Sequence, residues 1–167
     1  MKKFIFLLVF LLSCYSNAQI INFPDPVFKA VLLQSNTTNL IAGGVKIDAN
    51  DDGEIEVSEV FPVYQLQILS GNITDITGIE YFINLYYCVI RSNQIAHANL
   101  SNSPNLQTLT VNNNQLQSLN VSGLNQLYFI NCLEDRSKSL ISLKKTTQRH
   151  LHWQIFLLKW GKVHFCG

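Results

Sequence analysis

The 167-residue sequence predicts a small α/β protein, a short solenoid of about three to four turns behind a small helical cap. Three observations support this fold class. Apolar residues recur in a fixed pattern every 21 or 22 residues from Val63, which is typical of stacked turns with one strand each. A helix signal and an acidic loop precede this pattern, and the pattern stops after Cys132. The predicted organisation is a leader over 1–18, a cap over 19–62, repeats over 63–132 and a tail over 133–167.

The first 18 residues have the pattern of a secretory signal peptide. Two lysines precede nine unbroken apolar residues over 4–12, too few to span a bilayer. Small residues over 16–18 then predict cleavage before Gln19. The alternative is that Leu11 to Cys14 forms a lipobox, in which Cys14 carries the lipid that holds the protein on a membrane. Either route predicts a secreted or cell-surface bacterial protein.

The cap is predicted to begin with a short helix over 25–33. Asp25 is a typical N-cap residue, and two prolines flank it. The apolar face of this helix would consist of Val27, Phe28, Val31 and Leu32. Such a helix would cover the open sheet edge and the apolar end of the first turn.

An acidic loop over 48–59 matches the twelve-residue EF-hand calcium loop at every position, so the cap is predicted to be EF-hand-like. The oxygen ligands at positions 1, 3, 5, 7, 9 and 12 would come from Asp48, Asn50, Asp52, the carbonyl of Glu54, Glu56 and Glu59. Gly53 would permit the sharp turn. Carboxylates this dense repel one another, so we expect a single Ca²⁺ to order the loop. Residues 41–44 cannot form an entering helix, and the open alternative is an Asx-rich surface turn without an ion.

The repeat follows the pattern L-x-x-L-x-L-x-x-N-x-L, the signature of leucine-rich repeats. Positions 1, 4 and 6 of each unit are predicted to point inward from a short strand. Asn93 and Asn114 occupy position 9, where a side-chain amide can bond backbone groups of the bend, and Gly71 takes this place in the first unit. One turn cannot bury its own apolar face, so the turns must stack. An antiparallel sandwich with Asn-rich turns is the alternative interpretation.

The outward positions of the strands are predicted to form a concave binding surface. It would present Gln65, Gln67, Leu69, Tyr87, Val89, Arg91, Thr108, Thr110, Asn112 and Phe129. Tyr87, Arg91 and Phe129 are the predicted partner-binding residues, because Tyr, Arg and Phe are enriched at interfaces. The alternative is that they are ordinary solvent-facing positions.

The segment Leu66 to Ile79 resembles the internalin type of bacterial leucine-rich repeat, and the resemblance extends over roughly residues 21–132. It implies cell-surface adhesion or recognition of a protein ligand, in longer relatives that carry many repeats and an anchoring domain.

Composition changes abruptly at residue 133. Residues 20–132 carry three cations and nine acids, whereas residues 133–167 carry seven cations and two acids. All 17 asparagines lie before this point, and both tryptophans lie after it. We interpret the tail as out-of-frame or foreign sequence, possessing no repeat register, that truncates a longer array. The protein would then be a fragment without independent activity. Two weaker alternatives are zinc ligation by His150, His152, His164 and Cys166, and a basic membrane-surface helix over 151–160.

Catalysis and nucleic-acid binding are not predicted. His97 is the only histidine between residues 20 and 132, and this range contains no serine-hydrolase, zinc-protease or phosphate-loop motif. The acidic balance of the same range argues against a nucleic-acid partner. Cys88 and Cys132 occupy apolar positions two turns apart, about 9.6 Å at the usual strand spacing. No disulfide is expected between them, because this separation exceeds the reach of about 7 Å.

Overall fold

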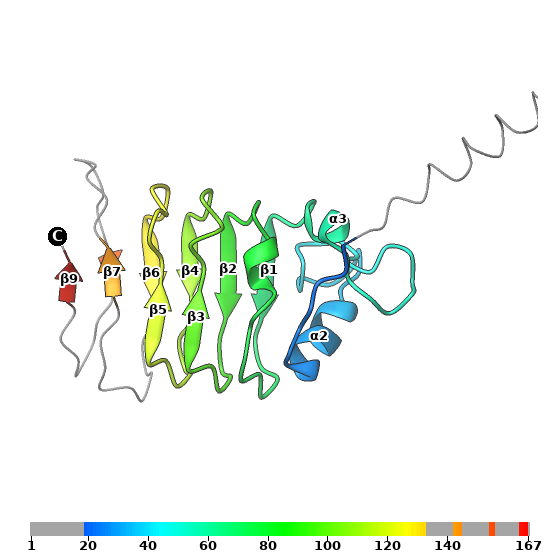
Figure 1. Ribbon diagram of the computed structural model, residues 1–167, viewed down its shortest axis with the longest axis horizontal. Helices are drawn as coiled ribbons and strands as arrows, with labels where there is room; N and C mark the ends of the chain where they lie inside the picture. The colour runs from blue at the N-terminus through cyan, green and yellow to red at the C-terminus, as the bar shows by residue number, and fades with distance from the viewer. Residues whose placement is uncertain (1–18, 133–141, 145–153, 156–163, 167) are drawn as a thin grey trace, which may run out of the picture.

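The structure is a computed structural model that describes residues 19–132 together with short strands at 142–144, 154–155 and 164–166. Figure 1 shows a straight stack of turns with a small cap at its N-terminal end. The described residues form a short β-solenoid of about three turns, as the repeat pattern predicts.

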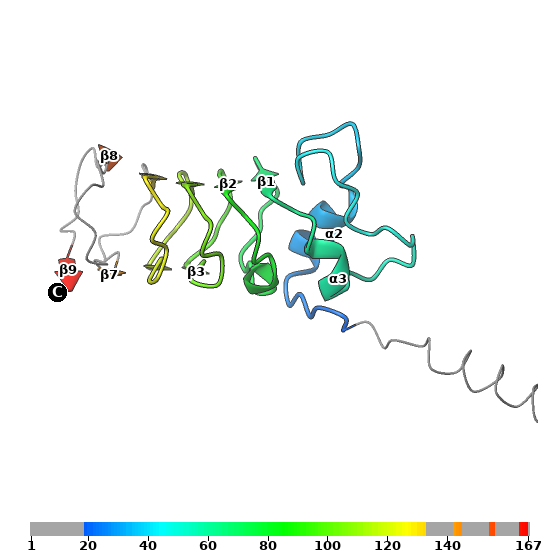
Figure 2. The same cartoon turned by 90° about the horizontal axis from the view of Figure 1, so that it is seen from above.

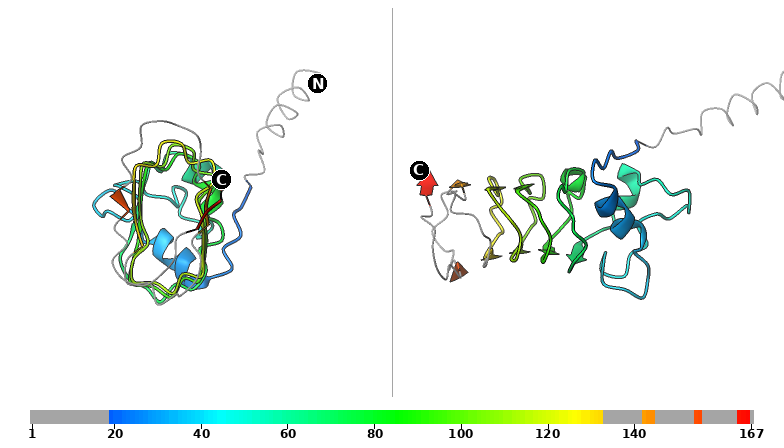
Figure 3. Two further views of the ribbon diagram at one scale, coloured as in Figure 1. Left: turned by 90° about the vertical axis from the view of Figure 1, so that its left-hand side faces the viewer. Right: turned by 90° about the horizontal axis from the view of Figure 1, so that it is seen from below.

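Parallel strands build a larger sheet along one side of the coil. Its strands in the repeats are β1 (Gln65–Ile68), β2 (Tyr87–Ile90), β4 (Thr108–Thr110) and β6 (Phe129–Asn131). Leu66, Cys88, Leu109 and Ile130 lie in register across these strands. A second sheet, made of β3 (His97–Asn99) and β5 (Ser118–Asn120), lies on the opposite side of the coil, as Figure 2 shows. Seen end-on in Figure 3, the turns superpose as a flattened ring.

One hydrophobic core runs through the cap and all the described turns. The side chains predicted to point inward, positions 1, 4 and 6 of every unit, are buried, which confirms the repeat register. The α/β class overstates the helical content. Apart from a single 3-10 turn, η1 (Ile79–Tyr81), the described helices belong to the cap. The reason is the short repeat, in which the return path is a strand or a loop and not a helix.

Two buried asparagines, Asn93 and Asn114, hold the bends that follow β2 and β4. Oδ1 of Asn114 accepts a hydrogen bond from the backbone N–H of Ile95 at 3.3 Å, and its Nδ2 donates to the carbonyl of Ile90 at 3.0 Å. Oδ1 of Asn93 likewise accepts from the N–H of Ile73 at 3.2 Å. The predicted role at position 9 is confirmed, and each amide also ties its own turn to the preceding one.

The cap contains α2 (Pro26–Leu33) and α3 (Val57–Val60), which follow the predicted helix signal and the predicted exit from the acidic loop. Asp25 is the N-cap of α2, and its Oδ1 accepts from the N–H groups of Val27 at 2.8 Å and Phe28 at 3.2 Å. The side chains of Phe28 and Leu32 are fully buried, so the helix covers the first turn as expected.

The same aspartate joins the cap to the first repeat. Its Oδ2 accepts from the N–H of Thr74 at 2.8 Å, the hydroxyl of Thr74 at 3.0 Å and the N–H of Asp75 at 3.2 Å. Beside this contact the ring of Phe23 packs edge-on against Phe28, with 5.5 Å between ring centroids. The cap is therefore attached to the first repeat by the hydrogen bonds of Asp25 and by the packing of Phe23 against Gly78.

The larger sheet continues past β6 with a strand that lies in the predicted tail. Strand β8 (Gln154–Ile155) pairs in parallel with β6, and β7 (Ser142–Lys144) pairs with β9 (His164–Cys166). Parallel pairing requires only backbone groups left open at the edge of β6, so it does not depend on the consensus side chains.

Several predictions of the sequence lie outside the described residues. These are the leader with Cys14, the side chains of the tail, and the histidine and cysteine pairs within it. In the described part of the chain, no helix is both long and apolar enough to cross a membrane.

Candidate functional site

The acidic loop folds around its own backbone amides. The buried carboxylate of Asp48 accepts from the N–H of Asp52 at 3.2 Å and from the N–H of Gly53 at 3.1 Å. Oδ1 of Asn50 accepts from the N–H of Asp52 at 3.0 Å, and Oδ1 of Asp52 accepts from the N–H of Glu54 at 2.8 Å. Gly53 has a φ of 81°, a left-handed conformation that favours glycine, as the motif predicts.

Glu59 closes the loop from the far end. Its Oε1 accepts from the N–H of Ala49 at 2.8 Å, and its Oε2 accepts from the N–H of Glu56 at 3.0 Å. Glu59, at position 12 of the predicted calcium loop, thus bonds the backbone of Ala49, the residue after Asp48 at position 1. The two ends of the loop are therefore held together by the carboxylate of Glu59.

Glu56 holds its proton more tightly than an ordinary glutamate, whereas Glu59 favours the ionised form, because the pKa values of the two carboxyl groups are shifted in opposite directions. The hydrogen bond to Glu59, burial, and the negative charges of Glu59 and Asp52 raise the pKa of Glu56 to about 7. Burial acts to raise the pKa of Glu59 as well, but hydrogen bonds from Glu56 and from backbone N–H groups outweigh it and lower that pKa. Two carboxyl groups held this close favour either a proton or a cation between them.

Two lysines neutralise the acids of the loop that the motif does not use as side-chain ligands. Nζ of Lys29 lies 2.8 Å from the carboxylate of Glu54, whose predicted ligand atom is its carbonyl. Nζ of Lys46 lies 2.5 Å from the carboxylate of Asp51, at the non-ligating position 4. Neither of these ion pairs engages the carboxylates of Asp48, Asp52, Glu56 or Glu59.

The donor set therefore fits a hard cation in chemistry and in order along the chain, since every predicted ligand atom is oxygen. Its present geometry is not that of a coordination shell. Within residues 19–132 and the short strands, no group of three or more His, Cys, Asp or Glu side chains converges closely enough to hold a metal. The carboxylates are turned toward backbone N–H groups, so binding would require Glu56 to exchange its proton for the ion.

The segment that follows the predicted cleavage site pairs with the loop. The N–H of Ile21 donates to the carbonyl of Ile55 at 2.8 Å, and the N–H of Val57 donates to the carbonyl of Gln19 at 2.9 Å. Residues 19–21 thus lie antiparallel to the loop and support it, although the loop has no second EF-hand beside it within residues 19–132. This contact was not predictable from the sequence, since backbone pairing over three residues leaves no side-chain pattern.

The predicted partner-binding residues lie on the outer face of the larger sheet. Tyr87 and Phe129 begin β2 and β6 and are half-buried, while Arg91 follows β2 and is exposed. Val89, expected at the same surface, is buried, because it lies between Gln67 and Thr110 of the two neighbouring strands. Tyr87, Arg91 and Phe129 therefore remain accessible on a sheet whose inner face is part of the core.

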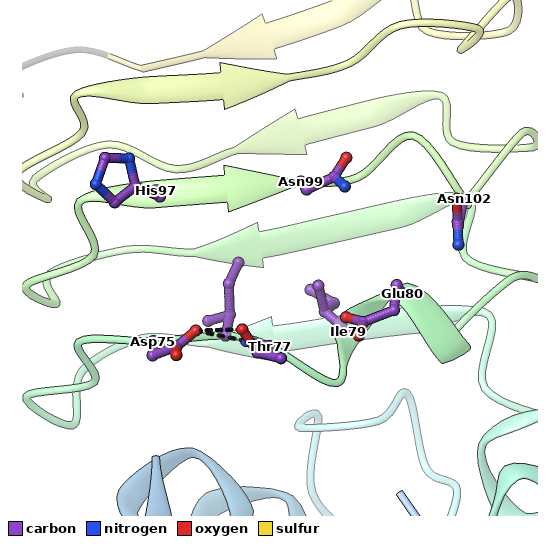
Figure 4. Close-up of a pocket in the computed structure, with 8 residues that line it drawn as sticks. Asp75, Thr77, Ile79, Glu80, His97, Asn99 and Asn102 are labelled. Carbon is purple, nitrogen blue, oxygen red and sulfur yellow. Dashed lines mark hydrogen bonds between the residues drawn. The ribbon is translucent and has the colours of Figure 1, made fainter. Parts of the chain in front are cut away.

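A polar cleft of about 290 Å³ lies on the other side of the coil, beside the first turn. Figure 4 shows Asp75 and Thr77 hydrogen-bonded to each other on the turn next to the strand that carries His97 and Asn99, with Glu80 on η1. His97 projects from β3, is exposed, and has its Nδ1 2.8 Å from the hydroxyl of Ser118. No sequence pattern indicates this cleft, because its residues come from two different turns.

A third feature was also missed. Position 2 of the units reads Tyr64, Tyr86, Gln107 and Tyr128, and the three tyrosines are among the most exposed large side chains of the described residues. Their recurrence at one position is the signal that could have revealed them.

Together these features define a class of protein, a capped parallel β-solenoid with an accessible sheet face. Two solved structures are similar. One is the functional domain of InlJ from Listeria monocytogenes, described as including a cysteine ladder, at 23% identity, with 71% of this chain and 25% of that chain covered and a TM-score of 0.49. The other is InlF, an internalin from Listeria monocytogenes strain 4b F2365, at 21% identity, with coverages of 72% and 38% and a TM-score of 0.40. This chain thus spans well under half the length of either. No protein-family model and no curated protein matches it.

Proposed function

We propose that the protein is a secreted or cell-surface adhesion module that binds a protein partner through the outer face of the larger sheet. The observation that carries this proposal is the placement of Tyr87, Arg91 and Phe129. All three are accessible on a sheet whose opposite face is buried, so they are presented by a rigid support. Side chains of these types supply much of the binding energy at protein interfaces when a partner excludes water from them.

The test compares the full chain with the double variant Arg91→Ala/Phe129→Ala in binding to extracellular proteins. A partner should be retained by the original chain and lost, by at least tenfold in affinity, by the variant. His97→Ala, an exposed change on the opposite side of the coil, should bind normally. Equal retention of every ligand by the double variant would place the interface elsewhere or leave the chain without one. The second outcome is expected if the chain is a truncated fragment with no independent activity.

We also propose that one Ca²⁺ stabilises the cap, with oxygen ligands from Asp48, Asn50, Asp52, Glu54, Glu56 and Glu59. Support comes from the hydrogen bonds of Glu59 that close the loop, the raised pKa of Glu56 beside Glu59, and the two lysines that pair only with the remaining acids. The ion would replace the proton on Glu56 and remove the repulsion within the loop. At a calcium concentration 100 times the Kd, the free energy of unfolding would rise by about 2.7 kcal/mol.

Thermal unfolding with calcium and with chelator tests this proposal. The full chain should melt at a higher temperature with calcium, and Glu59→Gln should abolish the difference. Asp51→Asn is the matched control, since it removes one charge from the same loop at a position paired with Lys46. Identical curves with calcium and chelator would overturn the proposal, and so would equal losses in the two variants.

Export would follow from the leader, and cleavage before Gln19 would leave the backbone contact between Gln19 and Val57 intact. The mass of the mature N-terminus separates the two routes. A chain that starts at Gln19 is a secreted protein, whereas one that starts at a lipid-modified Cys14 is a surface lipoprotein.

A further inference from the structure

Four residues form a column along the edge of the larger sheet, at the point where each strand begins. Tyr64, Tyr86, Gln107 and Tyr128 are joined in that order by backbone hydrogen bonds, each N–H donating to the carbonyl of the residue one turn earlier, at 2.9, 2.9 and 3.0 Å. The tyrosines are 52%, 38% and 52% exposed. We call this set the tyrosine column.

The column is a fixed platform. Each of its residues follows a fully buried residue of the core, namely Val63, Leu85, Leu106 and Leu127. The side-chain amide of Gln65 also donates to the hydroxyl of Tyr86, which orients that ring. A ligand would therefore meet aromatic rings that are already in place, and binding would require little additional ordering of the protein.

The four side chains of the column carry no charge, although residues 20–132 carry nine acids and the exposed Arg91 follows β2 on the same sheet. Most of these acids belong to the cap, and the other two, Asp75 and Glu80, line the cleft on the opposite side of the coil. Amides and hydroxyls such as those of Gln107 and Thr108 lie between the rings instead. This combination of rings, amides and hydroxyls suits a neutral ligand that has both apolar faces and hydrogen-bonding groups.

The spacing of the column distinguishes two such ligands. Neighbouring turns are about 4.8 Å apart, as strands in a sheet are. An extended peptide running along the solenoid repeats its side chains on one face about every 6.6 Å, which does not match. A pyranose residue in a linear chain has a length close to one strand spacing. Its C–H face can lie on a tyrosine ring while its hydroxyls reach the neighbouring amides.

We propose that the tyrosine column binds a neutral linear polysaccharide, with sugar rings stacked on Tyr64, Tyr86 and Tyr128 and one ring over Gln107, between the last two tyrosines. This site goes beyond the protein-binding surface proposed above, because it is built from different side chains. Either proposal can fail without the other.

The test is calorimetric titration of the full chain with hexamers of β-1,4-linked glucose, β-1,4-linked N-acetylglucosamine and α-1,4-linked glucose. At least one should bind, and Tyr64→Ala and Tyr128→Ala should each weaken it about 3- to 10-fold. Tyr128→Phe should retain most of the affinity, since the ring remains. Leu40→Ala is the matched control, because Leu40 is a large side chain, 66% exposed, that lies in the cap.

Circular dichroism of each variant checks that a loss of affinity is not a loss of fold. The proposal is overturned if none of the three hexamers binds, or if the alanine variants bind as the original chain does. It is also overturned if Tyr64→Ala impairs binding of a protein ligand and leaves sugar binding unchanged, since the column would then belong to the protein interface.

Discussion

The two carboxylate oxygens of Asp25 serve different elements. Oδ1 caps α2, and Oδ2 accepts three hydrogen bonds from Thr74 and Asp75 of the first turn. Burial alone would raise the pKa of this carboxyl, but the hydrogen bonds outweigh burial and lower the pKa to about 2. The ionised form is therefore strongly preferred in the folded state, and it links the cap to the repeats.

Acid should weaken this link in a defined range. A depressed pKa in the folded state adds stability that is complete above the unfolded value of 3.8 and is lost as the pH falls toward 2. Asp25 should contribute roughly 2 kcal/mol over this range. Urea titrations at several pH values should show a steep acid slope for the original chain and a shallower one for Asp25→Asn, which should also be less stable at pH 5. Parallel slopes would mean that Asp25 is not the group responsible.

Gly78 is required for close contact between the cap and the first turn. Its φ is 105°, and a Cβ placed on it would lie 2.5 Å from two ring atoms of Phe23. Gly123 has a similar φ of 80°, but a Cβ there would meet no atom within 4 Å. Backbone strain is thus common to both positions, whereas the collision is confined to Gly78.

Alanine at these two glycines should separate the effects. We expect Gly123→Ala to reduce the free energy of unfolding by about 1 kcal/mol, from backbone strain alone. Gly78→Ala should lose about 1–3 kcal/mol more, because Phe23 must move out of its packed position. Urea unfolding measures both. Equal losses would show that the contact with Phe23 yields without strain.

At the scale of the elements, the side chain of Asn114 holds the bend after β4 by several hydrogen bonds to backbone groups. Nδ2 of Asn114 lies within bonding distance of the carbonyls of Ile90 and Val111, at 3.0 and 2.8 Å, while its Oδ1 accepts from Ile95. Donor and acceptor are both used, so the orientation of the amide is determined by its partners. No other side chain of the same size supplies both.

These hydrogen bonds predict that both the loss of the amide group and its replacement by a carboxylate of the same shape destabilise the fold. Asn114→Ala should destabilise by about 2–4 kcal/mol, because buried backbone groups lose their partner. Asn114→Asp keeps the shape but directs an oxygen toward two carbonyls, so it should be at least as damaging at neutral pH. The exposed Asn125→Ala is the control and should change little. An aspartate variant as stable as the original would contradict the assigned orientation.

The elements also explain how far the sequence could predict this fold. Burial at Leu66, Cys88 and Leu109 was predictable, since a period of about 21 residues places them in register. The three-residue strand at His97 was not, because one buried side chain between two exposed ones is too short a pattern to identify a strand. The pairing of β8 with β6 depends only on backbone groups, which the consensus does not record.

The candidate sites divide in the same way. The order of the predicted ligands in the acidic loop could be predicted from the sequence, because all of them lie within twelve consecutive residues, 48–59. The lysine partners of that loop, the cleft beside His97 and the tyrosine column depend on which turns lie side by side. Position 2 is exposed in each unit, so no packing requirement restricts it and no consensus marked it in advance.

On the scale of the whole molecule, the cap and the repeats share one core, which runs from Ile21 to Cys132. Strand pairing joins each turn only to its neighbours, as in other solenoids, so the first turn alone carries the cap contacts to the rest. Asp25 and the Phe23–Gly78 contact are two of the described points at which this transfer takes place, and another is the hydrogen bond from the N–H of Gln67 to the carbonyl of Ile41 at 2.8 Å. A ligand that stabilises the cap should therefore stabilise the repeats through these contacts.

Calcium should consequently slow hydrogen exchange far from its proposed loop. In the original chain at 100 times the Kd, amides of the cap such as Val57 and amides of the repeats such as Leu109 should both gain about 100-fold in protection. Asp25→Ala combined with Gly78→Ala should make the gain at Leu109 smaller than the gain at Val57, because two of the contacts that couple the cap to the repeats are lost while the loop residues remain. A gain limited to the cap in the original chain would show that the shared core does not unfold as one unit. A gain at Leu109 that survives the double change in full would show that some other contact carries the coupling.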